Sequence, residues 1–172
     1  MDADLTKIKE QAMADFAEFI SPMKVRTMKA AKLDIIEQKR EGACVWDITG
    51  KKYIDCQTGS GIMNVGRHNP EIVQTLKEAL DTYDIGVFLL CSKQKADLAK
   101  KLAEITPGDL KCTIFGVGGG EANDAAIKIA RGYTMKTEII SAERAYHGHT
   151  GFALSAIGRA AYKEPFEPLM PG

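Results

Sequence analysis

Four glycines in five positions, at residues 116 and 118–120, mark the stretch of this chain best suited to chemistry. An apolar run at 112–115 precedes them, and apolar residues at helical spacing follow from Ala122 to Ala130. Glycine lets backbone N–H groups approach a ligand without a Cβ in the way, and the first N–H groups of a helix have no partner within it. This order of strand, loop and helix predicts an anion site, most often for phosphate, although a tight turn without a ligand has the same pattern.

Two common phosphate motifs fit this loop poorly. A dinucleotide fingerprint beginning at Gly116 would have its third glycine position at Glu121, and Glu138 or Glu143 only loosely matches the acidic residue expected about 20 positions further on. A P-loop fits less well still, because no Gly-Lys-Ser/Thr closes the loop. A single phosphate on a cofactor such as pyridoxal phosphate is the better match.

Tyr146 is placed to cover the ring of such a cofactor. The apolar run at 137–141 predicts a second strand, which makes 112–141 a β-α-β unit with parallel strands. Tyr146 follows that strand, at the carboxyl end where such sheets bind their ligands. A partly buried packing residue is the plain alternative at this position.

Helices, one hairpin and loops make up the other expected elements. In chain order they are a helix at 4–20 ended by Ser21-Pro22, a segment of open form at 24–39, a hairpin of 42–47 with 52–55, a glycine-rich loop at 58–66, a helix capped by Asn69, a helix from Ser92 to Ile105, and an extended loop from Lys163 onward.

Charge and cysteine content narrow the function classes. The 23 basic and 23 acidic residues cancel, which gives no reason to expect nucleic acid or a membrane surface as a partner. The four cysteines form no C-x-x-C pair, and their apolar surroundings predict buried free thiols in a reducing cytosol. No signal peptide or membrane span is visible, so we expect a cytoplasmic protein.

Several ordered motifs give the chain a specific family resemblance. Residues 118–131, followed by Tyr-His-Gly at 146–148, resemble the core of class III (omega) aminotransferases, which are pyridoxal-phosphate enzymes of fold type I. Further agreement comes from residues 46–55, 59–61, 64–70 and 165–172. The resemblance runs from about residue 42 to residue 172, and the final motif is most similar to the putrescine and 4-aminobutyrate branch.

The resemblance implies an α/β fold, the amino-terminal part of a fold type I transferase. Residues 1–65 would form an N-terminal helix and a small-domain segment, and residues 66–172 the first part of the large cofactor domain. The large domain would be incomplete, because parallel sheets usually have several strands covered on both faces.

The resemblance also implies a cofactor site for pyridoxal 5′-phosphate. The amides of Gly119 and Gly120, with Gly118 beside them, would hold the phosphate. Tyr146 would stack on the pyridine ring, and His147 would lie close by. Gly118 and Gly120 replace positions that often carry Ser, Thr or Ala, which removes a possible hydroxyl contact and leaves the backbone donors intact.

On the substrate side, the resemblance places Gly61 and Ile62 near the substrate entrance. His149 stands where acetylornithine-type members carry an arginine that grips a substrate carboxylate, so a different substrate is implied. A metal bound by His147 and His149 lacks an evident third ligand, and no metal is expected.

The implied parent reaction moves an amino group from an amine or omega-amino acid to a 2-oxo acid, in a homodimer. The Schiff-base lysine and the acid that pairs with the pyridinium lie downstream in the family, and Lys128, Lys136 and Lys163 read as surface lysines. No catalytic residue is therefore expected here, and the chain alone should be inactive. The alternatives are a non-catalytic fragment or subunit that assembles with a lysine-bearing remainder, and a small NAD-binding domain.

Overall fold

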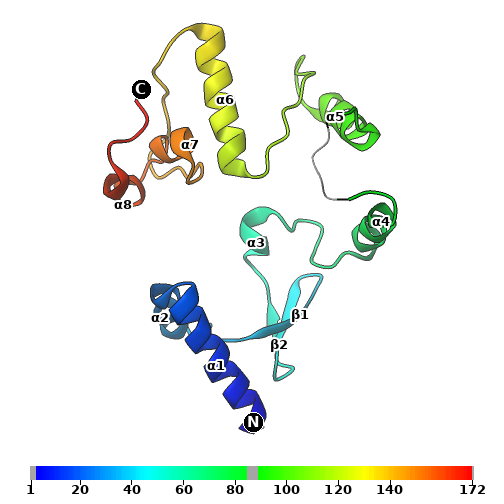
Figure 1. The fold of residues 1–172 in the computed structure, drawn as a ribbon, viewed down its shortest axis with the longest axis vertical. Coiled ribbons are helices and arrows are strands. Elements are labelled where there is room, and N and C mark those ends of the chain that lie inside the picture. Colours follow the sequence, from blue (N-terminus) through cyan, green and yellow to red (C-terminus); the bar gives the residue numbers. More distant parts are fainter. Residues whose placement is uncertain (1–2, 85–88, 172) are drawn as a thin grey trace. The chain divides into compact units, whose positions relative to one another are not determined.

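A computed structural model describes residues 3–84 and 89–171 of the chain (Figure 1). The chain divides into two compact units, Met1–Val87 and Phe88–Gly172, each described here by itself. The first unit contains two helices, a small sheet and two further helices. The second contains helices joined by long irregular segments.

Two helices, α1 (Ala3–Phe19) and α2 (Pro22–Ala30), pack against each other at the start of the first unit. The predicted helix at 4–20 and its end are confirmed. Ser21 also begins α2, because its hydroxyl accepts a hydrogen bond from the Lys24 N–H at 3.2 Å and proline fits the first turn of a helix. The segment of open form after Lys24 is therefore partly helical.

A three-stranded antiparallel sheet follows, in the order β1-β2-β3. The strands are β1 (Glu37–Glu41), β2 (Cys44–Asp47) and β3 (Lys52–Ile54), so the predicted hairpin is confirmed. Asp47 fixes its turn, because this buried carboxylate accepts hydrogen bonds from the backbone N–H and the hydroxyl of Thr49 at 2.9 and 2.6 Å. These bonds hold the pKa of Asp47 below its ordinary value, and the bond from the Thr49 hydroxyl has the largest effect.

The first unit ends with α3 (Thr58–Gly61) and α4 (Pro70–Leu80). The predicted glycine-rich loop contains α3 as one distorted turn, in which Gly59 and Ser60 both have φ 61°. Asn69 caps α4 as predicted, and its side chain accepts a hydrogen bond from the Glu71 N–H at 3.0 Å.

The second unit is built on α6 (Gly119–Thr134), against which α7 (Gly151–Ser155) packs. The fully buried Ala153 and the equally buried Ile157 form its core. The other elements are α5 (Lys93–Ile105), α8 (Ala160–Lys163) and the 3-10 helix η1 (Glu164–Phe166). Ser92 caps α5 as predicted, whereas the predicted extended tail contains η1.

The two strands predicted beside the glycine loop are not formed. Residues 112–115 and 137–141 have no regular structure, so the β-α-β prediction is wrong for this structure. A strand exists only where a neighbour accepts and donates its backbone hydrogen bonds, and these segments do not pair. Ile140 is 99% exposed, so no second layer covers that side of the segment.

The prediction of buried thiols is also wrong for most of the cysteines. Cys44 is half-buried in the sheet, but Cys56, Cys91 and Cys112 are exposed, and all four are free. The described apolar neighbours of these thiols, such as Ile54, Leu90 and Ile114, are themselves exposed, so apolar neighbours in sequence did not lead to burial.

The chain exposes more surface than two globular domains would. Its accessible area is 14106 Å², whereas two separate folded proteins of half its mass would expose about 10,000 Å² together. The buried apolar side chains among the described residues are Met13, Val25, Ala153 and Ile157. Local hydrogen bonds and helix caps therefore carry much of the observed structure.

Candidate functional site

The amino-terminal end of α6 forms an anion-binding geometry. Gly118 is the N-cap residue of α6 and has an extended backbone, with φ −169° and ψ 169°. No side chain caps this end of the helix. The N–H groups of Gly119 and Gly120 donate to no acceptor among the described residues. These unpaired donors and the positive end of the helix dipole favour a bound anion.

Space for such an anion is present at the loop. A Cβ built on Gly118 or Gly119 would meet no heavy atom within 4 Å. The lack of side chains at these two positions leaves open space beside the backbone of the loop. A phosphate group fits this donor set, because it accepts several hydrogen bonds and carries negative charge.

The segment Tyr146–Thr150, here called the aromatic loop, lies against this helix end. A Cβ on Gly148 would lie only 2.5 Å from Gly120 Cα, and Gly148 has φ 130°, a conformation that favours glycine. A Cβ on Gly120 would lie 3.0 Å from Thr150 Oγ1. Glycine at both positions therefore permits direct contact between the two backbones.

This contact brings the predicted cofactor residues of the second unit together. Tyr146 is 59% exposed as a residue, which does not fit the partly buried packing role. It lies edge-on to His149, with 5.4 Å between ring centroids, and to Tyr162 of α8 at 6.3 Å. The sequence analysis did not single out Tyr162, because it assigned no element to the residues just before Lys163. His147 is half-buried in the same loop.

Polar side chains of α6 complete the arrangement. Asn123 Nδ2 donates to the backbone carbonyl of His147 at 2.7 Å, and Asp124 Oδ1 accepts from the Ala153 N–H at 2.7 Å. Glu121 Oε2 accepts from the Val117 N–H at 2.6 Å. Sequence reasoning missed the long-range partners, although polar residues near the start of an otherwise apolar helix face were a visible signal.

Arg131, further along α6, anchors the end of the second unit. Its guanidinium stacks on the Phe152 ring, with Cζ 4.8 Å from the ring centroid, and donates to the Pro171 carbonyl at 2.8 Å. Its Nε atom is buried without a hydrogen-bond partner. A cavity of about 220 Å³ beside it also contains Lys163, whose Nζ is 3.4 Å from the Ser155 carbonyl.

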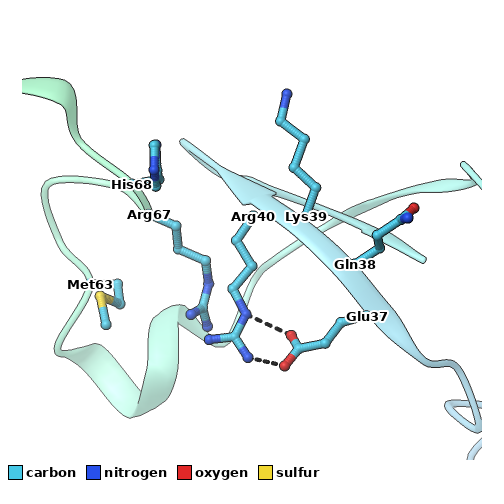
Figure 2. A pocket seen from close by; sticks show the side chains of 7 residues that line it. All are labelled: Glu37, Gln38, Lys39, Arg40, Met63, Arg67 and His68. Carbon is cyan, nitrogen blue, oxygen red and sulfur yellow. Dashed lines mark hydrogen bonds and ion pairs between the residues drawn. The ribbon is translucent and has the colours of Figure 1, made fainter. Parts of the chain in front are cut away.

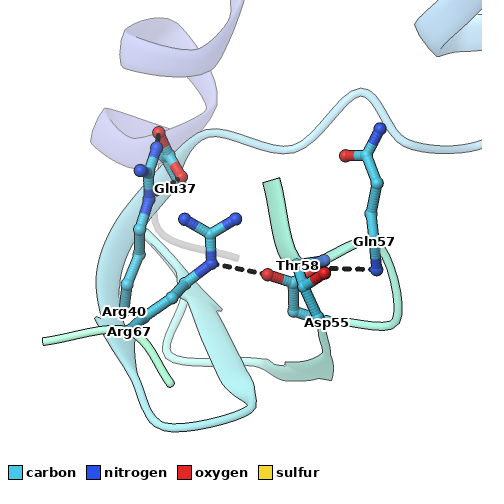
Figure 3. Close-up of polar contacts among 6 residues, drawn as sticks. All are labelled: Glu37, Arg40, Asp55, Gln57, Thr58 and Arg67. Atoms are coloured by element: carbon cyan, nitrogen blue, oxygen red, sulfur yellow. Dashed lines mark hydrogen bonds and ion pairs between the residues drawn. The ribbon is translucent and has the colours of Figure 1, made fainter. Parts of the chain in front are cut away.

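In the first unit, Asp55 shapes the loop that contains Gly61 and Ile62. Its carboxylate accepts hydrogen bonds from the Gln57 and Thr58 N–H groups, both at 3.0 Å, and pairs with Arg67 (Figure 3). The Arg67 guanidinium, more than any other group, holds the pKa of Asp55 below its ordinary value of 3.8.

The chain after these bonds turns sharply. Gly61 has φ 91°, and the side chain of Ile62 is 75% exposed. The structure thus shows the local conformation of Gly61 and Ile62 within the first unit. Their position at a substrate entrance stays a prediction.

A cavity of about 420 Å³ lies beside this loop (Figure 2). Its lining residues are Glu37, Gln38, Lys39, Arg40, Met63, Arg67 and His68. Each arginine and lysine is already paired: Arg40 with Glu37, Lys39 with Glu41, and Arg67 with Asp55. The hydrogen bond from Arg40 correspondingly lowers the pKa of Glu37. The paired charges make this cavity a weaker anion site than the free amides of α6.

Residues 3–84 and 89–171 contain neither a metal-binding cluster nor a membrane-spanning helix. No group of three His, Cys, Asp or Glu side chains there is arranged to hold a metal ion. Within the same ranges, every helix is too short or too polar to cross a membrane.

Comparison with known proteins gives a consistent result. The family model for class-III aminotransferases matches residues 26–172. An uncharacterized aminotransferase of Archaeoglobus fulgidus is 51% identical over 164 residues, which cover 95% of this chain and 38% of that protein.

Solved structures agree with this relationship. The (S)-enantioselective omega-transaminase of Thermomicrobium roseum matches 95% of this chain and 38% of its own, with a TM-score of 0.82 and 34% identity. The taurine:2-oxoglutarate aminotransferase of Bifidobacterium kashiwanohense, solved with pyridoxal phosphate and glutamate, matches 74% of this chain and 29% of its own, with a TM-score of 0.69 and 34% identity. The chain thus spans well under half the length of these proteins.

Proposed function

The chain belongs to the class III aminotransferase family, and from this premise we propose that it carries the cofactor-phosphate site of a pyridoxal-phosphate-dependent aminotransferase. One observation carries the proposal: the free amides of Gly119 and Gly120 adjoin an aromatic loop that contacts the same helix end through Gly148. A phosphate and a flat ring are the two parts of pyridoxal phosphate, and this arrangement suits both.

Each residue has a defined role in the proposal. The amides of Gly119 and Gly120 hold the phosphate, with Gly118 leaving room beside them. The exposed ring of Tyr146 covers one face of the cofactor ring, and His147 lies next to it. When bound, pyridoxal phosphate supplies an electron sink that stabilises negative charge on the reacting carbon of the substrate.

The proposed reaction transfers an amino group from an amine or omega-amino acid to a 2-oxo acid. The named activities of the taurine:2-oxoglutarate and omega-transaminase relatives support this substrate class. We further propose that Gly61, Ile62 and His149 contact the substrates, and that the working enzyme is a cytoplasmic homodimer.

The proposal treats this chain as the amino-terminal part of the enzyme, because it covers 38% of the length of its relatives. The division into a small-domain segment at 1–65 and a cofactor domain from 66 onward belongs to the same proposal. The lysine that binds the cofactor and the acid that pairs with its ring nitrogen would come from the remainder, so the chain alone would be inactive. The alternative of assembly with a lysine-bearing partner shares the same phosphate site. Family membership removes the reason for an NAD-binding domain.

The test uses 4′-deoxypyridoxine 5′-phosphate, which lacks the aldehyde and cannot react with surface lysines. Gly119→Ala adds a methyl group where no heavy atom lies within 4 Å, so the folded helix can accommodate it. In the proposal, this methyl group occupies space that the phosphate needs. Gly132→Ala, in the same helix and equally open, is the matched control.

We expect Gly119→Ala to weaken binding about tenfold or more, the cost of losing one or two charge-assisted hydrogen bonds. Gly132→Ala should bind as the unmodified chain does. Equal binding by both variants, or none by the unmodified chain, would contradict the proposed site.

A further inference from the structure

We propose that Glu121, Asn123 and Asp124 form a brace, here called the α6 brace, that sets the shape of the cofactor site before any ligand binds. The role of the brace in cofactor binding rests on the proposed function. The hydrogen bonds that form the brace are all made within this chain. Three side chains within four positions of α6 each hold a different segment, through bonds of 2.6–2.7 Å.

The first arm shapes the glycine loop. Glu121 Oε2 accepts from the Val117 N–H at 2.6 Å, and the same oxygen would lie 3.1 Å from a Cβ on Gly116. The carboxylate therefore ties the loop back to the first turn of α6. It uses the Val117 amide and leaves those of Gly119 and Gly120 free for the ligand.

The second arm holds the aromatic loop. Asn123 Nδ2 donates to the His147 carbonyl at 2.7 Å, across 24 positions of sequence. This is the one hydrogen bond made by residues 146–149, all of which the structure describes. The loop that carries Tyr146 is thus held against the helix end by Asn123 and by the contact between Gly120 and Gly148.

The third arm fixes the far side of the same loop. Ala153 is fully buried, and its N–H donates to Asp124 Oδ1 at 2.7 Å. Thr150, the residue that precedes α7, makes no capping bond with its own side chain. Asp124 of α6 therefore accepts the hydrogen bond from a first-turn N–H of α7, that of Ala153. A buried N–H without an acceptor would lower the stability of the folded chain.

Hydrogen exchange of the ligand-free chain tests the brace directly. Asp124→Ala should speed exchange of the Ala153 amide about tenfold, because the amide loses its acceptor. Asp124→Asn keeps a side-chain oxygen and should restore most of the protection. Amides of α5, which packs against no other described helix or strand, should be unchanged in every variant. Asp109→Ala, an exposed change in the same unit, is the control.

Ligand binding then separates positioning from simple stability. Asn123→Ala and Asp124→Ala displace the aromatic loop but not the amides, so they should weaken 4′-deoxypyridoxine 5′-phosphate about tenfold and leave the affinity for inorganic phosphate unchanged. Glu121→Ala alters the glycine loop itself and should weaken both ligands. Glu121→Gln keeps an acceptor for Val117 and should rescue both.

The outcomes distinguish the two proposals. Unchanged exchange at Ala153 in Asp124→Ala, or equally fast exchange in Asp124→Asn, would overturn the brace. Equal weakening of both ligands by all the alanine variants would show general destabilisation and overturn the positioning role. If the unmodified chain binds neither ligand, the proposed function fails, while the exchange result still decides the brace.

Discussion

At the scale of single residues, the site depends on where side chains are missing as much as on where they are present. Gly118 and Gly119 leave amides open, whereas Gly120 and Gly148 let two backbones meet. These two kinds of glycine predict opposite results for the same substitution. An alanine blocks a ligand in the first case and disrupts the fold in the second.

Gly148→Ala should destabilise the second unit by about 1–3 kcal/mol, because its Cβ would lie 2.5 Å from Gly120 Cα and its φ of 130° strains any other residue. Urea unfolding followed by circular dichroism measures the change. Gly132→Ala is the control and should stabilise α6 slightly, since alanine favours a helix more than glycine does. Equal stability of the two variants would contradict the close contact.

Asp55 predicts an acid-sensitive loop in the first unit. Its pKa is lowered in the folded state, chiefly by Arg67, so its contribution is present above the ordinary value of 3.8 and is lost as the pH falls through the lower folded value. Exchange protection of the Gln57 and Thr58 amides, corrected for intrinsic rates, should therefore fall below about pH 4. Asp55→Asn should remove this step. Asp81→Asn, which removes an exposed carboxylate after α4, should keep it.

At the scale of elements, helices with strong local signals form even where little covers them. In α4, the apolar side chains of Ile72, Leu76 and Leu80 remain 47%, 57% and 59% exposed. The helix is nevertheless capped by Asn69 and begun by Pro70. Its stability should depend unusually strongly on the cap, because tertiary packing contributes little.

Asn69→Ala should cost about 1 kcal/mol of helix stability, since the Glu71 N–H loses its acceptor. Exchange rates of the α4 amides, read against those of α1, measure the effect within one sample. Lys77→Ala, an exposed change on the same helix, should leave the α4 rates nearly as they were. A cap variant with unchanged α4 exchange would show that packing, not capping, holds this helix.

At the scale of the whole molecule, the exposed apolar surface is the dominant feature. Patches of this kind bind other apolar surfaces in water. We expect the isolated chain to enhance the fluorescence of 8-anilinonaphthalene-1-sulfonate strongly and to associate as its concentration rises in sedimentation experiments. A dye-silent monomer at every concentration would mean that these faces are covered in a way the structure lacks.

The sequence by itself determined the parts whose causes are local. Asn69 and Ser92 begin their helices because a cap acts within three residues. The turn after Asp47 is closed by its carboxylate, which accepts hydrogen bonds from the backbone N–H groups of Thr49 and Lys51, two and four positions away. The glycine loop before α6 was predictable for the same reason. The motifs around it also identified the family, which the matched residues 26–172 confirm.

Only the tertiary structure decided what depends on distant partners. The segments 112–115 and 137–141 carry strand-forming residues yet remain irregular, because a strand needs a hydrogen-bonding neighbour. The bonds from Asn123 to His147 and from Arg131 to Pro171 span 24 and 40 positions. No periodicity encodes such pairs, since they form only when the chain path has brought the two ends within hydrogen-bond reach.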